Sequence, residues 1–251
     1  MVVEIGSEIR IRDASKELYD WAQENLIIPN PQYRERERRG LWVGNTPKYL
    51  WLYHVDGSDL IVPTGVGKQV RQFLSEKDKI SVHLADNGIL DYKGTIPLYD
   101  YQKDAVEAMQ RTSCGILQSP CGSGKTQMGI ALAAELSRKV LWITHTQDLL
   151  TQSKTRAEQY FPEETLGTIT AGKAQVGSHI TFATVQTLCK MDLDQFRYTW
   201  DVVIVDECHR LAGSPTQVTM FYKVMNGLAA RHKYGLSATV HRSDGMIKST
   251  F

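Results

Sequence analysis

The sequence predicts an α/β fold in two parts: a mostly parallel, doubly wound sheet over residues 98–251, preceded by a small α+β accessory domain. From Tyr99 onward, segments alternate in the order helix, strand, loop, helix, strand, helix, strand, strand, helix, strand. Such alternation is typical of parallel sheets with helices on both faces. Residues 202–205 are a continuous apolar run, as expected of a central strand that is buried on both faces.

Residues 1–90 show a different pattern and are predicted to form the accessory domain. An alternating segment is followed by a helix from Ser15, with Leu18, Trp21 and Ala22 facing inward, and by a break at the prolines near residue 30. Strand-like runs at 48–55 and 59–62 flank Asp56-Gly57-Ser58, which favours a hairpin turn. A stretch with Gly and Pro follows, and its end, residues 91–97, is the predicted linker between the two domains.

Residues 119–126 have the composition of a phosphate-binding loop. Its glycines let the backbone curl close to phosphates, Lys125 can reach the β and γ phosphates of ATP, and the Thr126 hydroxyl can bind Mg²⁺. A strand-like run precedes the loop and an Ala-rich helical segment follows, which is the context the motif requires. Serine replaces the leading glycine of the pattern. The predicted ATP-binding residues of the loop are Ser119, Pro120, Cys121, Gly122, Ser123, Gly124, Lys125 and Thr126.

Two acids follow the apolar run at 202–205. Because open α/β sheets bind ligands at the carboxyl ends of their strands, we expect Asp206 to hold Mg²⁺ with Thr126 and Glu207 to polarise the attacking water. Lys125, Asp206 and Glu207 are therefore the predicted catalytic residues. A zinc site at Cys208 and His209 is not favoured, since no second Cys or His pair has ligand spacing.

With further segments, these motifs make the chain resemble superfamily 2 helicases and translocases, specifically the DEAH-like branch that includes UvsW-like, XPB-like and restriction-type ATPases. Residues 98–102 are similar to that branch's first motif, in which the glutamine, here Gln102, recognises adenine. Residues 140–152 and 180–188 resemble motifs that contact nucleic acid, which implies this role for Thr144, Thr184 and Gln186. Residues 235–245 resemble motif III, which implies that Ser237 and Thr239, with His209, couple nucleotide state to nucleic-acid grip.

The resemblance implies a first RecA-like, P-loop NTPase lobe at 98–251, a second RecA-like lobe of the same full-length chain, and ATP and Mg²⁺ bound between the two. We expect the present sequence to be a fragment that binds ATP weakly and hydrolyses it slowly, because the second lobe would supply an arginine finger. The expected partner is nucleic acid, DNA rather than RNA. The alternative is a noncatalytic, nucleotide-gated nucleic-acid-binding module, but Glu207 favours a motor because a switch needs no water-polarising acid.

Composition agrees with a globular protein: the chain has 251 residues, 42% of them hydrophobic and 23% charged, with a net charge of +1. This balance of charges excludes a broad, strongly basic surface for binding nucleic acid. No stretch approaches the ~20 apolar residues of a membrane span, and the N-terminus carries acids, so we expect a cytoplasmic protein without a membrane partner. The four cysteines lack paired spacing and fit a reducing compartment.

Two other segments admit alternative interpretations. Residues 63–69 mimic a phosphate loop but lack the hydroxyl after Lys68, so we interpret them as a turn with a solvated lysine. Residues 34–39 alternate Arg and Glu, and aromatic residues follow them. The favoured interpretation is a solvated helix face beside aromatics that pack a core. The other is a surface on which arginines and aromatics engage nucleic acid. The aromatic residues are Trp42, Tyr49, Trp51 and Tyr53.

Overall fold

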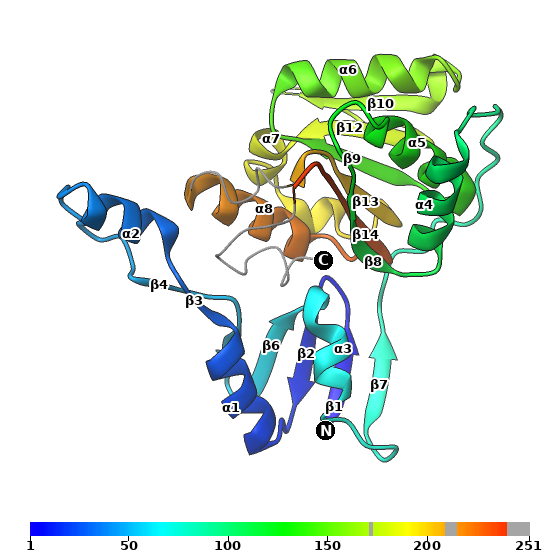
Figure 1. Cartoon of the computed structure of the whole chain (residues 1–251). Helices are drawn as coiled ribbons and strands as arrows, with labels where there is room; N and C mark the ends of the chain where they lie inside the picture. The colour runs from blue at the N-terminus through cyan, green and yellow to red at the C-terminus, as the bar shows by residue number, and fades with distance from the viewer. Residues whose placement is uncertain (171–172, 209–214, 240–251) are drawn as a thin grey trace.

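The computed structural model describes residues 1–170, 173–208 and 215–239, which form a large lobe and a smaller N-terminal part (Figure 1). Each part has its own sheet and its own apolar core. Among the helices of the described residues, none has the length and apolar character needed to cross a bilayer.

A seven-stranded sheet forms the centre of the large lobe. Its neighbouring strands are parallel except for β11, which pairs antiparallel with β10 at one edge. The prediction of a mostly parallel sheet is therefore confirmed. In sheet order the strands are β11 (Lys173–Gln175), β10 (Leu166–Thr170), β12 (Ile180–Thr184), β9 (Val140–Thr144), β13 (Val202–Val205), β14 (His232–Ser237) and β8 (Cys114–Gln118).

Helices cover both faces of this sheet. One apolar cluster joins α4 (Asp100–Gln110), α5 (Lys125–Leu136) and α6 (Gln147–Glu158) to one face. A second cluster joins α7 (Val185–Cys189), the 3-10 turn η3 (Leu193–Phe196) and α8 (Pro215–Gly227) to the other. Every residue of β9, β12 and β13 is buried, because side chains of a strand alternate between two covered faces. This explains the continuous apolar run that predicts β13. The turn η2 (Glu163–Thr165) precedes β10.

The N-terminal part contains a mixed five-stranded sheet in which β1 and β7 are parallel and the other pairs antiparallel. Its order is β5 (His54–Asp56), β6 (Asp59–Pro63), β2 (Glu8–Arg12), β1 (Val2–Ile5) and β7 (Lys79–Val82). The predicted helix is α1 (Lys16–Asn25), which buries Leu18 and Ala22 and begins where the Ser15 hydroxyl accepts the Leu18 amide. The predicted hairpin turn joins β5 to β6, with Gly57 at a φ of +62°.

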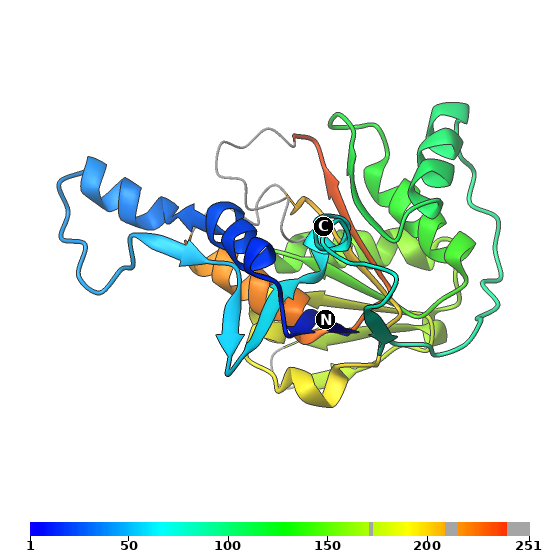
Figure 2. The same ribbon diagram turned by 90° about the horizontal axis from the view of Figure 1, so that it is seen from below.

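The predicted strand at 48–55 is wrong in one respect, because it is two strands. Only β5 enters the five-stranded sheet, whereas β4 (Tyr49–Trp51) pairs with β3 (Ile27–Pro29) in a separate ribbon. Leu52 and Tyr53 between them are buried, and the Leu52 amide donates to the Leu26 carbonyl, which turns the chain inward. With α2 (Pro31–Arg38) and the loop after it, this ribbon forms a projection, residues 27–51, called the arm here (Figures 1 and 2).

The expectation that the nearby aromatics pack a core holds for Tyr53 alone. Trp42, Tyr49 and Trp51 are exposed. The physical reason is that β4 pairs with a strand of only three residues, and within the described residues no other strand pairs with this ribbon.

The segment that mimics a phosphate loop forms a 3-10 turn, η1 (Thr64–Val66), running into the short helix α3 (Gly67–Arg71). Its Lys68 is exposed, as predicted. The predicted linker has no regular secondary structure, yet it is fastened to the large lobe, because the Tyr92 hydroxyl donates to the Arg138 carbonyl at 2.8 Å. Just before the linker, the Asn87 amide donates to Asp201 Oδ1 at 2.8 Å.

Two lobe side chains also fasten the N-terminal part. The Lys233 ammonium on β14 is buried and donates to the carbonyls of Met225 and Ser7, at 2.7 and 3.4 Å, and to Thr64 Oγ1 at 3.2 Å. The Tyr222 hydroxyl on α8 donates to the Leu52 carbonyl at 2.6 Å, at the base of the arm.

Candidate nucleotide-binding site

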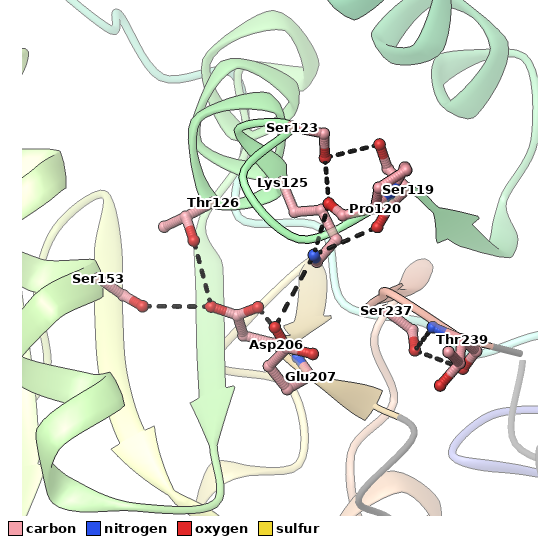
Figure 3. A network of polar contacts seen from close by, with 10 residues as sticks. All are labelled: Ser119, Pro120, Ser123, Lys125, Thr126, Ser153, Asp206, Glu207, Ser237 and Thr239. Carbon is pink, nitrogen blue, oxygen red and sulfur yellow. Dashed lines mark hydrogen bonds and ion pairs between the residues drawn. The ribbon is translucent and has the colours of Figure 1, made fainter.

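The predicted phosphate loop connects the end of β8 to the start of α5, at the carboxyl edge of the parallel sheet (Figure 3). Gly122 and Gly124 have φ values of +80° and +82°, which side chains other than glycine rarely adopt. A Cβ on Gly124 would also lie 2.5 Å from Gln102 Nε2. The loop therefore needs glycine at residue 124 for both its backbone angle and its close packing.

Lys125 lies at the first turn of α5 and is only 7% exposed. Its ammonium donates to the carbonyls of Ser119 and Pro120, each at 3.2 Å, and lies 3.9 Å from Glu207 Oε1 (Figure 3). The charge is thus directed into the concave side of the loop, where phosphate oxygens would be stronger acceptors than these carbonyls.

The serine that replaces the leading glycine braces the loop. Ser119 Oγ donates to Ser123 Oγ at 2.7 Å, and Ser123 Oγ donates to the Pro120 carbonyl at 2.7 Å. The Ser119 amide donates to the Ser237 carbonyl at the end of β14. Cys121 lies exposed on the same loop. Serine is therefore compatible with the closed loop because its hydroxyl has a partner inside it.

Asp206 lies directly after β13 and faces α5 and α6. Its Oδ2 is 3.5 Å from Thr126 Oγ1 and 3.3 Å from Ser153 Oγ (Figure 3). Burial raises the pKa of Asp206 to about 6, and the negative charge of Glu207 adds to this shift. A carboxylate beside a hydroxyl is a donor pair that suits Mg²⁺, so Thr126 and Asp206 are fit to hold that ion, whose charge would favour ionised Asp206.

Ser153 belongs to this site although the sequence interpretation did not select it. It is buried on α6, between Leu150 and Ala157 on the buried face of the helix. A single hydroxyl residue in an otherwise apolar stripe is the signal that points to a buried polar partner.

Glu207 has a φ of +50°, a left-handed conformation that is uncommon for a residue with a side chain. Its amide donates to Asp206 Oδ1 at 2.9 Å, and its carboxylate faces Lys125. Such backbone strain concentrates at functional sites. Here it turns the two adjacent acids apart, so that Asp206 faces Thr126 and Glu207 faces the lysine.

Gln102 belongs to the segment that resembles the helicases' first motif, and its side chain contacts the phosphate loop. Its Oε1 accepts the Tyr99 amide at 2.9 Å, and its Nε2 donates to the Ser123 carbonyl at 2.9 Å. The Tyr101 hydroxyl donates to the same carbonyl at 3.0 Å. The predicted adenine reader is therefore adjacent to the phosphate loop, and its contact with adenine stays a prediction.

The predicted nucleic-acid residues lie at the carboxyl ends of the neighbouring strands β9 and β12 and just beyond β12. Thr144 Oγ1 donates to the Thr146 carbonyl at 3.0 Å, Thr184 Oγ1 accepts the Thr187 amide at 3.4 Å, and Gln186 Nε2 donates to the His145 carbonyl at 2.9 Å. The two threonine bonds stabilise the segments that follow β9 and β12, and the Gln186 bond joins these segments. Their contact with nucleic acid also stays a prediction.

The predicted coupling residues Ser237 and Thr239 bond to each other at the end of β14, where Ser237 Oγ donates to the Thr239 carbonyl and accepts the Thr239 amide (Figure 3). His209 lies outside the described residues. Burial raises the pKa of the neighbouring Cys208 thiol to about 12, so this thiol remains protonated at neutral pH.

Comparison with known proteins shows which family the chain resembles. The family model described as "Type III restriction enzyme, res subunit" matches residues 95–242. The DNA 3'-5' translocase XPB2 of Sulfurisphaera tokodaii is 29% identical over 71% of this chain and 39% of its own length. A putative ATP-dependent RNA helicase of Acanthamoeba polyphaga mimivirus is 26% identical over 68% of this chain and 33% of its own. The chain thus spans less than two fifths of these curated relatives.

Among solved structures, the UvsW helicase from bacteriophage T4 superposes with a TM-score of 0.69 at 21% identity, covering 100% of this chain and 98% of that one. This likeness shows that the whole fold, N-terminal part included, is shared. Because the family model matches more than half of the residues, the chain belongs to the type III restriction enzyme res subunit family, and with it to the superfamily 2 helicases and translocases related to UvsW and XPB.

Proposed function

We propose that this chain is the ATP-binding lobe, with an accessory domain at 1–90, of a nucleic-acid-dependent motor that couples ATP hydrolysis to movement along a strand. The observation that carries the proposal is the convergence of Lys125, Thr126, Asp206 and Glu207 at one edge of the sheet. A cation, a hydroxyl and two acids within contact distance are what phosphoryl transfer to water requires.

Each residue has a separate task in this proposal. The loop amides and Lys125 bind the β and γ phosphates, and Thr126 and Asp206 hold Mg²⁺, which when bound neutralises charge on the phosphates. Glu207 accepts a hydrogen bond from the attacking water and so orients it. It lies 3.9 Å from Lys125, the residue that would bind the γ phosphate.

The proposed nucleic acid is DNA, because the XPB2 relative is a DNA translocase. The mimiviral relative is a putative RNA helicase, so the test includes RNA. The complete motor also needs a second RecA-like lobe of the full-length chain, whose arginine finger typically contributes ~10³ to 10⁵ in rate.

Nucleotide binding by the present chain tests the site directly. Lys125→Ala should abolish binding of a fluorescent ATP analogue in the presence of Mg²⁺, whereas Lys68→Ala, which removes the exposed lysine of the mimicking segment, should leave binding unchanged. The reverse pattern would refute the assignment of the phosphate loop.

Turnover of the full-length protein separates a motor from a noncatalytic switch. We expect DNA-stimulated ATP hydrolysis that Glu207→Gln removes while ATP binding persists, because the amide cannot polarise water as the carboxylate does. If no hydrolysis occurs with single-stranded DNA, duplex DNA or RNA, the motor proposal fails and a nucleotide-gated binding module remains.

A further inference from the structure

The arm carries an exposed aromatic surface that the ATP-binding lobe does not use. Trp42, Trp51 and Tyr49 are 84%, 61% and 47% exposed. The other tryptophans behave differently: Trp142 and Trp200 are fully buried, and Trp21 packs against Phe73 with ring centroids 5.9 Å apart. Several exposed large aromatics on one projection indicate a binding surface rather than ordinary surface scatter.

The tip of the arm holds Trp42 outward. Helix α2 ends at Arg38 and is followed by a Schellman motif, in which Gly40 has a φ of +63° and the Leu41 amide donates to the Arg36 carbonyl. Arg36 Nη1 then donates to the Trp42 carbonyl at 3.2 Å. A Cβ on Gly44 would lie 2.8 Å from Trp42 Cζ3, so one edge of the indole packs on this glycine while most of the ring stays in solvent.

The ribbon at the base of the arm adds two rings on one face. Side chains of a strand alternate, so Tyr49 and Trp51 of β4 lie on the same face, opposite Leu50. Their partners across the ribbon are Pro29 and Ile27, which are also apolar. A strip of planar and apolar side chains therefore runs along the ribbon.

Positive charge is concentrated on the arm. Residues 31–49 contain five Arg and Lys against two Glu, whereas the remaining residues of 1–90 contain seven against eleven Asp and Glu. One of the two glutamates, Glu35, is paired with Arg39 at 2.7 Å. Arg34, Arg38 and Arg39 are exposed, as is Lys48, whose Nζ lies 5.9 Å from the ring centroid of Tyr49. The arm is thus a basic surface on an otherwise acidic domain.

We propose that the arm binds an unpaired nucleic-acid strand, with bases stacked on Trp42 and Trp51 and phosphates paired with the arginines of α2. Arginines beside exposed rings fit a polyanion whose base faces are free, and a duplex hides those faces in its own stack. The inference rests on the proposed function, because it assumes that the protein acts on nucleic acid.

The arm is fixed to the ATP-binding lobe, so a strand bound there has a defined position. Leu52 directly follows Trp51, and its carbonyl accepts the Tyr222 hydroxyl of α8 at 2.6 Å. Lys233 of β14 fastens the adjoining sheet through Ser7 and Thr64. Such preorganisation lowers the entropy lost on binding.

The experiment uses residues 1–251 and fluorescence anisotropy with a labelled oligo-dT of about 20 nucleotides and a blunt duplex of equal length. We expect the Trp42→Ala, Trp51→Ala double variant to lose about a factor of ten or more in oligo-dT affinity for each ring removed, as stacking energies imply. Its affinity for the duplex and for the ATP analogue should equal that of the wild type. The matched control is Tyr198→Ala, which removes an exposed aromatic from the large lobe and should change nothing.

Intrinsic fluorescence gives a second readout, because Trp42 and Trp51 are the two exposed tryptophans among the five of the chain. Oligo-dT should quench this emission in the wild type, and the double variant should lose the quenching.

Unchanged oligo-dT affinity in the double variant, or an equal loss of affinity for oligo-dT and duplex, would overturn the proposal. So would a dimer that sedimentation detects in the wild type and not in the double variant, since the aromatic surface would then join two copies. If the wild type binds no oligonucleotide but still binds the ATP analogue, the arm proposal is refuted and the assignment of the nucleotide site is not.

Discussion

Gly129 allows α5 to lie close to the central sheet, and replacing it with alanine tests how the phosphate loop is positioned. A Cβ on Gly129 would lie 2.7 Å from Trp142 Cη2 and 2.8 Å from Leu236 Cδ1. Trp142 is fully buried on β9 and Leu236 is fully buried on β14, so neither neighbour can move into solvent. The helix must therefore shift away from the sheet.

Two opposing free-energy terms set how much Gly129→Ala changes the stability of the protein. Alanine is favoured over glycine in a helix interior by about 1 kcal/mol. Overpacking a dense core costs about 1 to 3 kcal/mol, and two contacts well below van der Waals distance place this site at the upper end. We expect Gly129→Ala to lower the free energy of unfolding by about 2 kcal/mol. Since Lys125 begins the same helix, the shift should also weaken binding of the ATP analogue.

Urea unfolding followed by circular dichroism measures the first effect, and fluorescence titration measures the second. Gly115→Ala is the control, because a Cβ there would meet only Thr112 Oγ1, at 3.8 Å. It should not lower the unfolding free energy, because alanine is favoured over glycine within a strand by about 0.5 to 1 kcal/mol. A Gly129→Ala protein as stable as the wild type would show that α5 does not approach Trp142 and Leu236 this closely.

Three further predictions concern polar groups. Burial lowers the pKa of Lys233 from its ordinary 10.5 to about 8, so the unfolded chain holds this proton to higher pH than the folded one. The free energy of unfolding should therefore rise by about 1 to 3 kcal/mol between pH 8 and 10.5, and Lys233→Met should remove this rise in urea titrations. Tyr222→Phe should cost about 1 kcal/mol and speed amide exchange near Leu52, measured by mass spectrometry, because the Leu52 carbonyl loses its donor. The Ser153 hydroxyl lowers the pKa of Asp206, so Ser153→Ala should weaken Mg²⁺-dependent binding of the ATP analogue more at pH 6 than at pH 8; equal loss at both values would contradict this.

The sequence predicted those elements that local physical chemistry determines. The strand at 202–205 is buried on both faces and so is apolar throughout, and Ser15 caps its own helix. Gly124 is required by its backbone angle. By contrast, the predicted order has two strands between the third helix of the lobe and the next helix, whereas the structure has three, β10, β11 and β12; Lys173–Gln175 is a strand of three exposed residues with no apolar pattern. The pairing of β10 with β12 and with β11 depends on residues distant along the chain.

The sequence interpretation was wrong or incomplete at positions whose surroundings depend on tertiary packing. Trp51 and Tyr53 are two residues apart in one strand-like run. Trp51 is nevertheless exposed on the ribbon, whereas Tyr53 is buried in the core cluster of the N-terminal part. Ser153 became part of the site only because α6 packs beside β13 and places its hydroxyl 3.3 Å from Asp206. Neither outcome follows from periodicity, since both depend on which element lies opposite.

Strand β14 links the candidate nucleotide-binding site to the N-terminal part. Its Lys233 holds Ser7 and Thr64 of that part, and its Ser237 carbonyl accepts the Ser119 amide of the phosphate loop. Lys233 and Ser237 are four steps apart along the strand, a span of about 13 Å. β14 is hydrogen-bonded on both sides, to β13 and β8, so it is held in register along this span. If ATP binding at the candidate site displaces β14, the contacts that hold the N-terminal part would therefore change, and the arm would move with its base.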